Sequence, residues 1–439
     1  MSEIEEIAKV RDQLRSTRLE DLIKIRDRIV GSLPETSWFD KASETAVYLE
    51  IFRRTGVIDR QLYARVFYTV ESVSVLSELK PIVRQSPKML SSVVPRSAVK
   101  VLFLSSKFGN YVSSQELVAG LLKEIGSNVE VVLASRRPID EVYGSRFESF
   151  TFVYPGDLRE ICRKVAPDKI VDLSGDHFNL LATISSQIHL ADPWGLSSGC
   201  GLEHSSIAWG NAPKYLDFYV GPYTVDDVVP IFVPAESSCR TYPEIHPMSA
   251  SMTEQVNLGA FCRTSKLNAK VVGIWADLMR ANPATTLTFA FIQSNANSET
   301  FVKHFFEKKG VAPSRVRFLP RLDTANYLAQ LNNIDINLGA MPEQGGVSCV
   351  DSLLMGCPYP VCDETSNTFT SSLVLRKLQL DCWVAETLED YRTLLARLIA
   401  DVKTFRNIEN RESLRKRLLG SSLSSPVATA STWSRFLRV

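Results

Sequence analysis

The sequence of 439 residues lacks the spacings that mark metal centres and disulfide frameworks. Its five histidines form no His-x-His or His-x-x-x-His pattern, and its eight cysteines include no Cys-x-x-Cys pair. Zinc sites and small secreted domains normally show such spacings, so we expect neither a metal centre nor structural disulfides. Several cysteines stand in apolar surroundings and are predicted to be buried thiols of a reducing compartment.

The chain also lacks long apolar runs and an excess of charge of either sign. No stretch approaches the roughly 20 apolar residues that a transmembrane helix needs. The first residues, MSEIEEIAKV, are charged where a signal peptide would be apolar. With 50 Lys plus Arg against 49 Asp plus Glu, the formal net charge is +1. This balance argues against nucleic acid or an anionic membrane as the main partner, and we expect a cytoplasmic protein.

The length exceeds what one hydrophobic core usually organises, so two or three domains are expected. Residues 1–95 carry apolar side chains at helical spacing and no glycine-punctuated strands. This pattern predicts an all-helical N-terminal domain, with one helix over residues 3–30 and further helices over 42–53 and 59–79. Such a domain either binds a partner or acceptor, or only stabilises the rest of the chain.

The rest of the chain alternates short apolar strands with amphipathic helices. The alternation begins with the strands 99–104 and 129–134 and restarts at the strand 256–261. This order predicts two parallel sheets covered by helices, one in a domain of residues 96–250 and one in a domain of residues 251–439. The predicted fold class is therefore α/β, with an all-α domain in front. Two Rossmann-like domains facing across a cleft, with a terminal helix crossing back, describe the GT-B fold.

One predicted loop, between the strand 334–338 and a helix beginning near Ser348, has the features of an anion site. Gly345 and Gly346 would let backbone N–H groups face outward at the helix N-terminus, where anions bind well. Asp351 follows one turn into the helix, within reach of a sugar hydroxyl. Two adjacent glycines are a weak motif, however, and an ordinary turn that binds nothing fits the loop equally well.

Five blocks, in order and spacing, resemble glycosyltransferase family 41, which holds the O-GlcNAc transferases and the bacterial cytoplasmic N-glycosyltransferases that modify adhesins. In the second half these are residues 261–268 (FCRTSKLN), 289–295 (FAFIQSN) and 335–358, which contains the glycine loop. In the first half they are residues 104–110 (LSSKFGN) and 208–220. The likeness covers about residues 98–405, and the short helical N-terminus is more like the adhesin-modifying branch.

The resemblance implies an inverting, metal-independent protein glycosyltransferase without a resident cofactor. It would transfer a hexose or HexNAc from UDP-glucose or UDP-GlcNAc to Asn or Ser/Thr side chains. In the family, a lysine at the position of Lys266 meets the diphosphate and an aspartate at the position of Asp351 binds the ribose. The predicted donor-binding residues are Lys266, Arg263, Gln293, Gly345, Gly346, Val347, Ser348 and Asp351.

On the acceptor side, Asp176 and His177 follow a predicted strand end and are candidates for a catalytic base. A hydrogen-bonded loop histidine is the plainer interpretation of His177. Tyr111 could orient the acceptor or the donor sugar, and it stands where the family has a histidine. This departure favours one alternative, a degenerate GT-B protein that acts as a binding or scaffold subunit. A transferase to a non-protein acceptor, which would share the donor site, is a further alternative.

Overall fold

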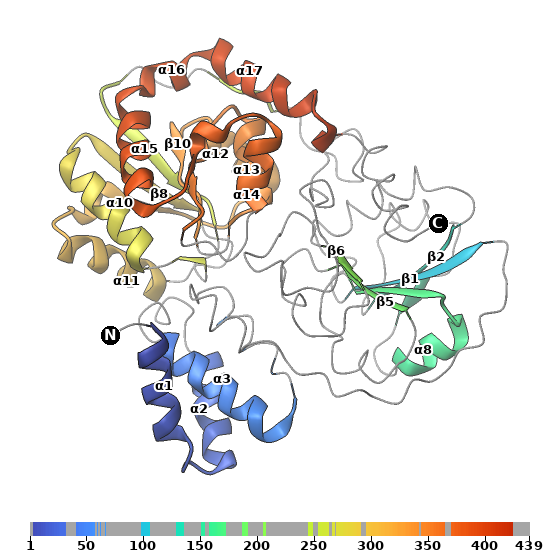
Figure 1. The fold of residues 1–439 in the computed structure, drawn as a ribbon. Coiled ribbons are helices and arrows are strands. Elements are labelled where there is room, and N and C mark those ends of the chain that lie inside the picture. The colour runs from blue at the N-terminus through green and yellow to red at the C-terminus, as the bar shows by residue number, and fades with distance from the viewer. Residues whose placement is uncertain are drawn as a thin grey trace. The chain divides into compact units, whose positions relative to one another are not determined.

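A computed structural model describes the chain in several stretches. They are residues 3–31, 41–57, 59, 62, 66, 98–105, 129–135, 151–153, 158–172, 187–191, 205–207, 245–248, 253–262, 266–267, 269–290, 296–341, 344–364 and 370–424. The chain divides into two compact units (Figure 1). One comprises Met1–Thr55, Gln61–Glu78 and Tyr242–Ser421, and the other comprises Gly56–Arg60, Leu79–Thr241 and Ser422–Val439. The domain boundaries predicted near residues 95 and 250 stay a prediction.

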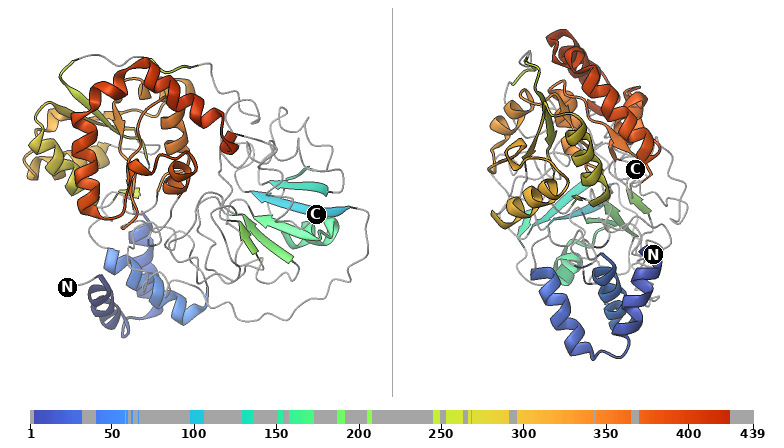
Figure 2. Two further views of the ribbon diagram at one scale, coloured as in Figure 1. Left: turned by 45° about the horizontal axis from the view of Figure 1, so that its top comes forward. Right: turned by 90° about the vertical axis from the view of Figure 1, so that its left-hand side faces the viewer.

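Three helices open the chain, and α3 packs against both of the others (Figure 2). They are α1 (Glu3–Leu14), α2 (Leu19–Gly31) and α3 (Lys41–Thr55). The prediction of a single helix over residues 3–30 is wrong, because the helix breaks after Leu14. The Arg54 guanidinium donates hydrogen bonds to the carbonyls of Leu14 (3.1 Å), Arg15 (2.9 Å) and Thr17 (2.5 Å). These bonds satisfy backbone acceptors that the broken helix leaves open.

The second unit contains a six-stranded sheet in the order β3-β2-β1-β4-β5-β6, with every neighbouring pair parallel. Its strands are β1 (Val99–Ser105), β2 (Val129–Ser135), β3 (Thr151–Val153), β4 (Lys169–Asp172), β5 (Gln187–Ala191) and β6 (Ser205–Ile207), with α8 (Leu158–Val165) between β3 and β4. The first four strands and α8 confirm the predicted alternation. The strands β5 and β6 were not predicted from the sequence.

The first unit contains a parallel sheet in the order β10-β7-β8-β9. The parallel pair β11 and β12 continues it, because Asn337 N donates to Pro358 O (2.9 Å) and Gly339 N to Pro360 O (3.1 Å). The strands are β7 (Val256–Ala260), β8 (Thr285–Ala290), β9 (Val316–Leu319), β10 (Ile336–Asn337), β11 (Val361–Cys362) and β12 (Val384–Ala385).

Helices cover this sheet on both faces, as the alternating pattern predicted. Figure 1 shows its strands between α10 and α11 on one side and α12, α13 and α14 on the other. The helices are α10 (Ala269–Ala281), α11 (Ala296–Lys308), α12 (Thr324–Leu331), α13 (Val347–Leu354), α14 (Thr370–Lys377), α15 (Leu388–Ala400), α16 (Val402–Arg406) and α17 (Ile408–Leu419), with short 3-10 turns at Pro313–Arg315, Asp381–Trp383 and Ser422–Ser424.

Large aromatic side chains fill the core of this unit. Trp275 of α10 is fully buried, and its indole N–H donates to the Tyr391 hydroxyl of α15 at 3.2 Å. The ring of Phe289 stacks on Phe318 and meets Phe306 edge-on. Buried aromatic groups with satisfied polar atoms contribute strongly to packing, so α10, α11 and α15 are held firmly to the strands.

The described cysteines are free thiols, as expected from their spacing. Five are buried and Cys382 is exposed; the buried ones are Cys162, Cys262, Cys349, Cys357 and Cys362. Burial raises the pKa of the Cys357 thiol to about 12, so it stays protonated and unreactive at neutral pH. None of the helices in the described stretches is long and apolar enough to cross a membrane.

Candidate functional site

The order of the strands marks one edge of the first unit's sheet as the place for a ligand. The chain passes from β7 to β8 and β9 in one direction and then returns to β10 on the other side of β7. Ligands of open parallel sheets bind outside the carboxyl ends of the strands where the strand order reverses in this way. Lys266 follows the carboxyl end of β7, and Gly345–Ser348 follow that of β10. The fold therefore brings the two separate parts of the predicted donor site to the same edge.

The helix that starts at this edge, α13, lacks a capping side chain at its N-cap, Gly346. Three other helices of the unit begin with a side chain that accepts a backbone N–H: Asp323 from Asn326 (2.8 Å), Thr387 from Asp390 (3.1 Å) and Asn407 from Glu409 (2.7 Å). A glycine in this position leaves the first-turn N–H groups to some other acceptor. Because the helix dipole is positive there, an anion is the acceptor that fits best.

Close contacts fix the form of the glycine loop. A Cβ atom on Gly345 would lie 2.2 Å from Ser348 Oγ and 2.7 Å from the Tyr359 hydroxyl, so no larger residue fits without a shift. The Ser348 and Tyr359 hydroxyls are hydrogen-bonded at 2.9 Å. The Gly345 carbonyl accepts the hydroxyl of Ser371. Burial raises the pKa of Tyr359, so its hydroxyl remains a neutral partner of Ser348.

The residue before the glycines, Gln344, anchors the loop to α14. Its amide donates to Asp363 Oδ1 (2.9 Å) and Ser372 Oγ (2.8 Å), and its carbonyl accepts the Ser372 backbone N–H (2.8 Å). Asp363 also pairs with Arg376 at 2.7 Å. The sequence prediction missed this role because Gln344 stands inside a predicted turn, where its partner nearly thirty residues away leaves no local signal.

Lys266 and Asp351 are both buried, with 7% and 3% of their surface exposed. Lysine and aspartate side chains are rarely buried unless they have a partner. Neither side chain is therefore a solvated surface group, and the roles of both in donor binding stay predictions.

The predicted acceptor-side residues belong to the second unit. Its strand order reverses between β1 and β4. Tyr111 follows β1 in the sequence, and Asp176 and His177 follow β4. These three residues, together with Arg263 and Gln293, lie outside the described residues, so their roles stay predictions.

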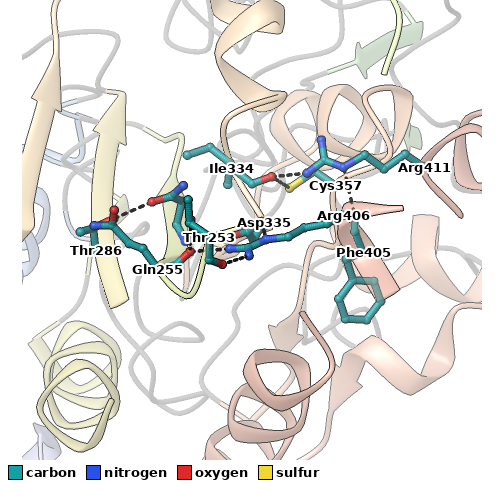
Figure 3. Close-up of polar contacts among 10 residues, drawn as sticks. Thr253, Gln255, Thr286, Ile334, Asp335, Cys357, Phe405, Arg406 and Arg411 are labelled. Atoms are coloured by element: carbon teal, nitrogen blue, oxygen red, sulfur yellow. Dashed lines mark hydrogen bonds and ion pairs between the residues drawn. The ribbon is translucent and has the colours of Figure 1, made fainter. Parts of the chain in front are cut away.

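The amino end of the first unit's sheet carries a buried ion pair instead (Figure 3). Arg406 donates from Nε and from one terminal nitrogen to the two carboxylate oxygens of Asp335, each at 2.7 Å. Asp335 also accepts the Asn257 backbone N–H at 2.8 Å, and Arg406 donates to the carbonyls of Thr253 and Gln255. The hydrogen bonds that Arg406 donates to Asp335 raise the pKa of the guanidinium, which therefore stays charged. Across the described residues, no group of three or more His, Cys, Asp and Glu could hold a metal ion.

No protein-family model matches the chain, but individual proteins and a solved structure are similar to it. A probable UDP-N-acetylglucosamine–peptide N-acetylglucosaminyltransferase SPINDLY of Solanum lycopersicum is 26% identical over 365 residues, which are 76% of this chain and 38% of the relative. The rice protein of the same name (Oryza sativa subsp. japonica) is 26% identical over 195 residues, 44% of this chain and 20% of the relative. The chain thus spans well under half the length of these relatives.

A solved structure extends the likeness to the whole fold. The O-GlcNAc transferase of Thermobaculum terrenum, solved as a mutant, superposes with a TM-score of 0.72 over 92% of this chain and 81% of its own, at 18% identity. The predicted GT-B type of α/β fold is thereby confirmed. The plant relatives support the resemblance to glycosyltransferase family 41.

The fold brings Lys266 and residues 345–348 to one sheet edge, with Asp351 in the helix that starts there. It also identifies polar residues that the motif comparison passed over. These are Gln344, Asn337, Ser352 and Tyr359, all buried close behind the loop in the fold. Apart from the Ser348 carbonyl, which accepts the Ser352 hydroxyl within α13, their hydrogen-bond partners come from other elements, so the local sequence did not predict these roles.

Proposed function

We propose that this chain transfers a sugar from a UDP-sugar to side chains of other proteins. The observation that carries the proposal is the reversal of strand order between β7 and β10, which brings Lys266 and the uncapped N-terminus of α13 to one edge. A buried cation and a helix N-terminus together suit a diphosphate. The names of the plant relatives support a peptide as the acceptor.

In the proposed reaction, the predicted donor-binding residues stabilise the leaving group. As the bond between the anomeric carbon and the diphosphate oxygen breaks, negative charge grows on UDP. The Lys266 ammonium and the N–H groups of Gly346, Val347 and Ser348 would lie against that charge. Asp351 would hold the ribose hydroxyls. Arg263 and Gln293 would add contacts to the phosphates and the donor, and no metal or resident cofactor takes part in the proposal.

The acceptor side completes an inverting transfer. The nitrogen of an Asn or the oxygen of a Ser/Thr side chain attacks the anomeric carbon from the face opposite the diphosphate. Its proton passes to Asp176 or His177, which act as base. Tyr111 orients one of the two substrates. An amide nitrogen is a weak nucleophile, so an Asn acceptor would depend on orientation more than on the base.

The two branches of the family favour different donors. The names of the plant relatives support UDP-GlcNAc. The likeness of residues 261–268 and 289–295 to the adhesin-modifying branch supports UDP-glucose. A cytoplasmic location is part of the proposal for either donor.

A second candidate function is a binding or scaffold subunit that holds a nucleotide without turning it over. Tyr111, at the position of a family histidine, favours it. A turnover assay that measures UDP release with UDP-glucose and UDP-GlcNAc separates the two functions. Release that depends on an acceptor peptide supports the transferase, while binding without release supports the scaffold.

The donor site is tested first, by calorimetry and thermal shift with UDP. We expect the wild-type chain to bind UDP and Lys266→Ala to weaken binding roughly tenfold or more, the scale of one charge-assisted contact. Lys309→Ala, which removes an exposed lysine just after α11, is the matched control and should leave the affinity unchanged. No effect of UDP on the wild type would contradict both candidate functions.

A further inference from the structure

A buried side chain behind the glycine loop, Asn337, connects the two parts of the donor edge. It is the last residue of β10 and has no exposed surface. Its carbonyl oxygen accepts the backbone N–H of Phe261, the first residue after β7, at 3.2 Å. Its amide nitrogen donates to the Ser352 hydroxyl at 2.6 Å. One asparagine thus joins the end of β7 to the helix α13.

The connection continues into the first turn of α13. The Ser352 hydroxyl, also fully buried, donates to the backbone carbonyl of Ser348 at 2.6 Å. Three hydrogen bonds therefore run in series from the Phe261 N–H through Asn337 and Ser352 to Ser348. Each group in the middle accepts one bond and donates the next. Buried hydrogen bonds arranged in this way strengthen one another and hold a single geometry.

The packing around Asn337 also restricts it to one position. A Cβ atom on Gly259, in the neighbouring strand β7, would lie 3.2 Å from Asn337 Oδ1 and 2.9 Å from Ile334 Cγ2. Glycine at that position leaves the room that the asparagine needs. The chemistry is equally restrictive, because only an amide side chain of this length both accepts from Phe261 and donates to Ser352.

We propose that Asn337 is a positioning residue of the nucleotide site, which sets where the α13 N-terminus lies relative to the segment that carries Lys266. The inference rests on the proposed donor site. The ammonium and the helix amides have to meet the same diphosphate, and the series of hydrogen bonds joins the strand end before Lys266 to the first turn of α13. A displacement of about 1 Å in such a site is enough to weaken binding and catalysis.

The experiment compares UDP affinity with thermal stability in three variants. Asn337→Ala removes both bonds of the asparagine, and Ser352→Ala removes one hydroxyl. The control, Thr286→Ala, removes a part-buried side-chain bond, from Thr286 Oγ1 to Asn257 Oδ1 (2.9 Å), at the amino ends of β8 and β7. All three are expected to melt at lower temperature than the wild type. UDP affinity should fall about fivefold in Asn337→Ala and Ser352→Ala, the scale of one net hydrogen bond, and stay unchanged in Thr286→Ala.

The double variant Asn337→Ala/Ser352→Ala should bind UDP no more weakly than Asn337→Ala, because both changes break the same series. This inference would be overturned if Asn337→Ala and Ser352→Ala bound UDP as tightly as the wild type, or if Thr286→Ala lost as much UDP affinity as they did. In either case UDP binding by the wild type would still support the donor site. Absence of UDP binding by the wild type would remove the donor site and this inference together. Should Asn337→Ala fail to fold, Ser352→Ala decides alone.

Discussion

The two ends of the sheet made by β7 and its neighbours are stabilised by different chemistry. The amino end is charged: Arg406 and Asp335 form a buried, two-point ion pair, and the fully buried Arg411 donates to the carbonyls of Ile334 (2.5 Å) and Phe405 (2.9 Å) (Figure 3). Behind the glycine loop at the carboxyl end, the side-chain hydrogen bonds of Asn337 and Tyr359 join neutral groups.

This difference separates stability from binding. At the amino end each charge of the Arg406–Asp335 pair is matched by its partner, so the pair exerts little field beyond it. At the carboxyl end the hydrogen bonds of Asn337, Ser352 and Tyr359 join neutral groups, and the Asp363 carboxylate that anchors Gln344 is paired with Arg376. The helix dipole of α13 and Lys266 can then act on a ligand. Changes at one end should therefore affect folding, and changes at the other should affect affinity.

The largest effect is expected from breaking the ion pair. Arg406→Ala leaves the Asp335 carboxylate buried, with only 1% of its surface exposed, and without its cation. Such a loss costs about 3–5 kcal/mol of unfolding free energy, measurable by urea denaturation. UDP affinity of the folded fraction should match the wild type. The control Arg280→Ala, which removes an exposed ion pair with Asp277, should cost less than about 1 kcal/mol of unfolding free energy. An equal cost for the two variants would contradict the special role of the buried pair at the amino end.

A smaller effect on stability, with a clear effect on binding, is expected from Gly345→Ala. The added methyl meets Ser348 Oγ and the Tyr359 hydroxyl, so the first turn of α13 has to shift. We expect about 1–3 kcal/mol of destabilisation from overpacking and roughly tenfold weaker UDP binding by calorimetry. The control is Gly273→Ala in α10, where a Cβ meets no atom within 4 Å. Unchanged affinity in Gly345→Ala would mean that the loop geometry does not matter for the ligand.

The smallest effect is expected in the N-terminal helices, where Glu50 is buried between Arg53 and Arg54. Hydrogen bonds, first from Arg53 and then from Arg54, hold the pKa of Glu50 at about 2, against the opposing effect of burial. The unfolded chain has a glutamate pKa of about 4.3. The stabilisation is therefore complete above the unfolded pKa and is lost as the pH falls from there through about 2. Circular dichroism melts between pH 7 and pH 2.5 should show this loss, and Glu50→Gln should flatten that part of the profile. If the melting temperature of Glu50→Gln falls with pH as steeply as that of the wild type, the loss does not come from Glu50 and this prediction is wrong.

The elements that the sequence predicted best are those with strong local periodicity. The strands predicted over residues 99–104, 129–134 and 256–261 agree within one residue with β1, β2 and β7. Hydrophobic spacing fixes such elements within a few residues of chain. The donor edge was also predictable, because alternating strands and helices imply that carboxyl ends meet at one edge.

The features that the sequence did not predict depend on partners far along the chain. The break after Leu14 is stabilised by Arg54, and Asp335, taken only as a residue of the predicted strand, proved to be the partner of Arg406 in α16. The strands β5 and β6 stand in a stretch where Gly, Ser and Pro obscure the period. Asn337 lies in the block 335–358, but its role was not predicted, since that role arises only when Phe261 and Ser352 come to either side of it.

The pairing between β10 and the chain leading to β11 has a consequence for hydrogen exchange. Asn337 and Gly339 donate across it to the carbonyls of Pro358 and Pro360, and prolines have no N–H to return. Because all of these hydrogen bonds are donated from the β10 side, this pairing has fewer hydrogen bonds than a full parallel ladder. We therefore expect it to open before the pairing of β7 with β8. Exchange of the amide protons of Asn337 and Gly339 therefore reports opening beside the glycine loop, and a ligand that tightens the loop would slow this exchange.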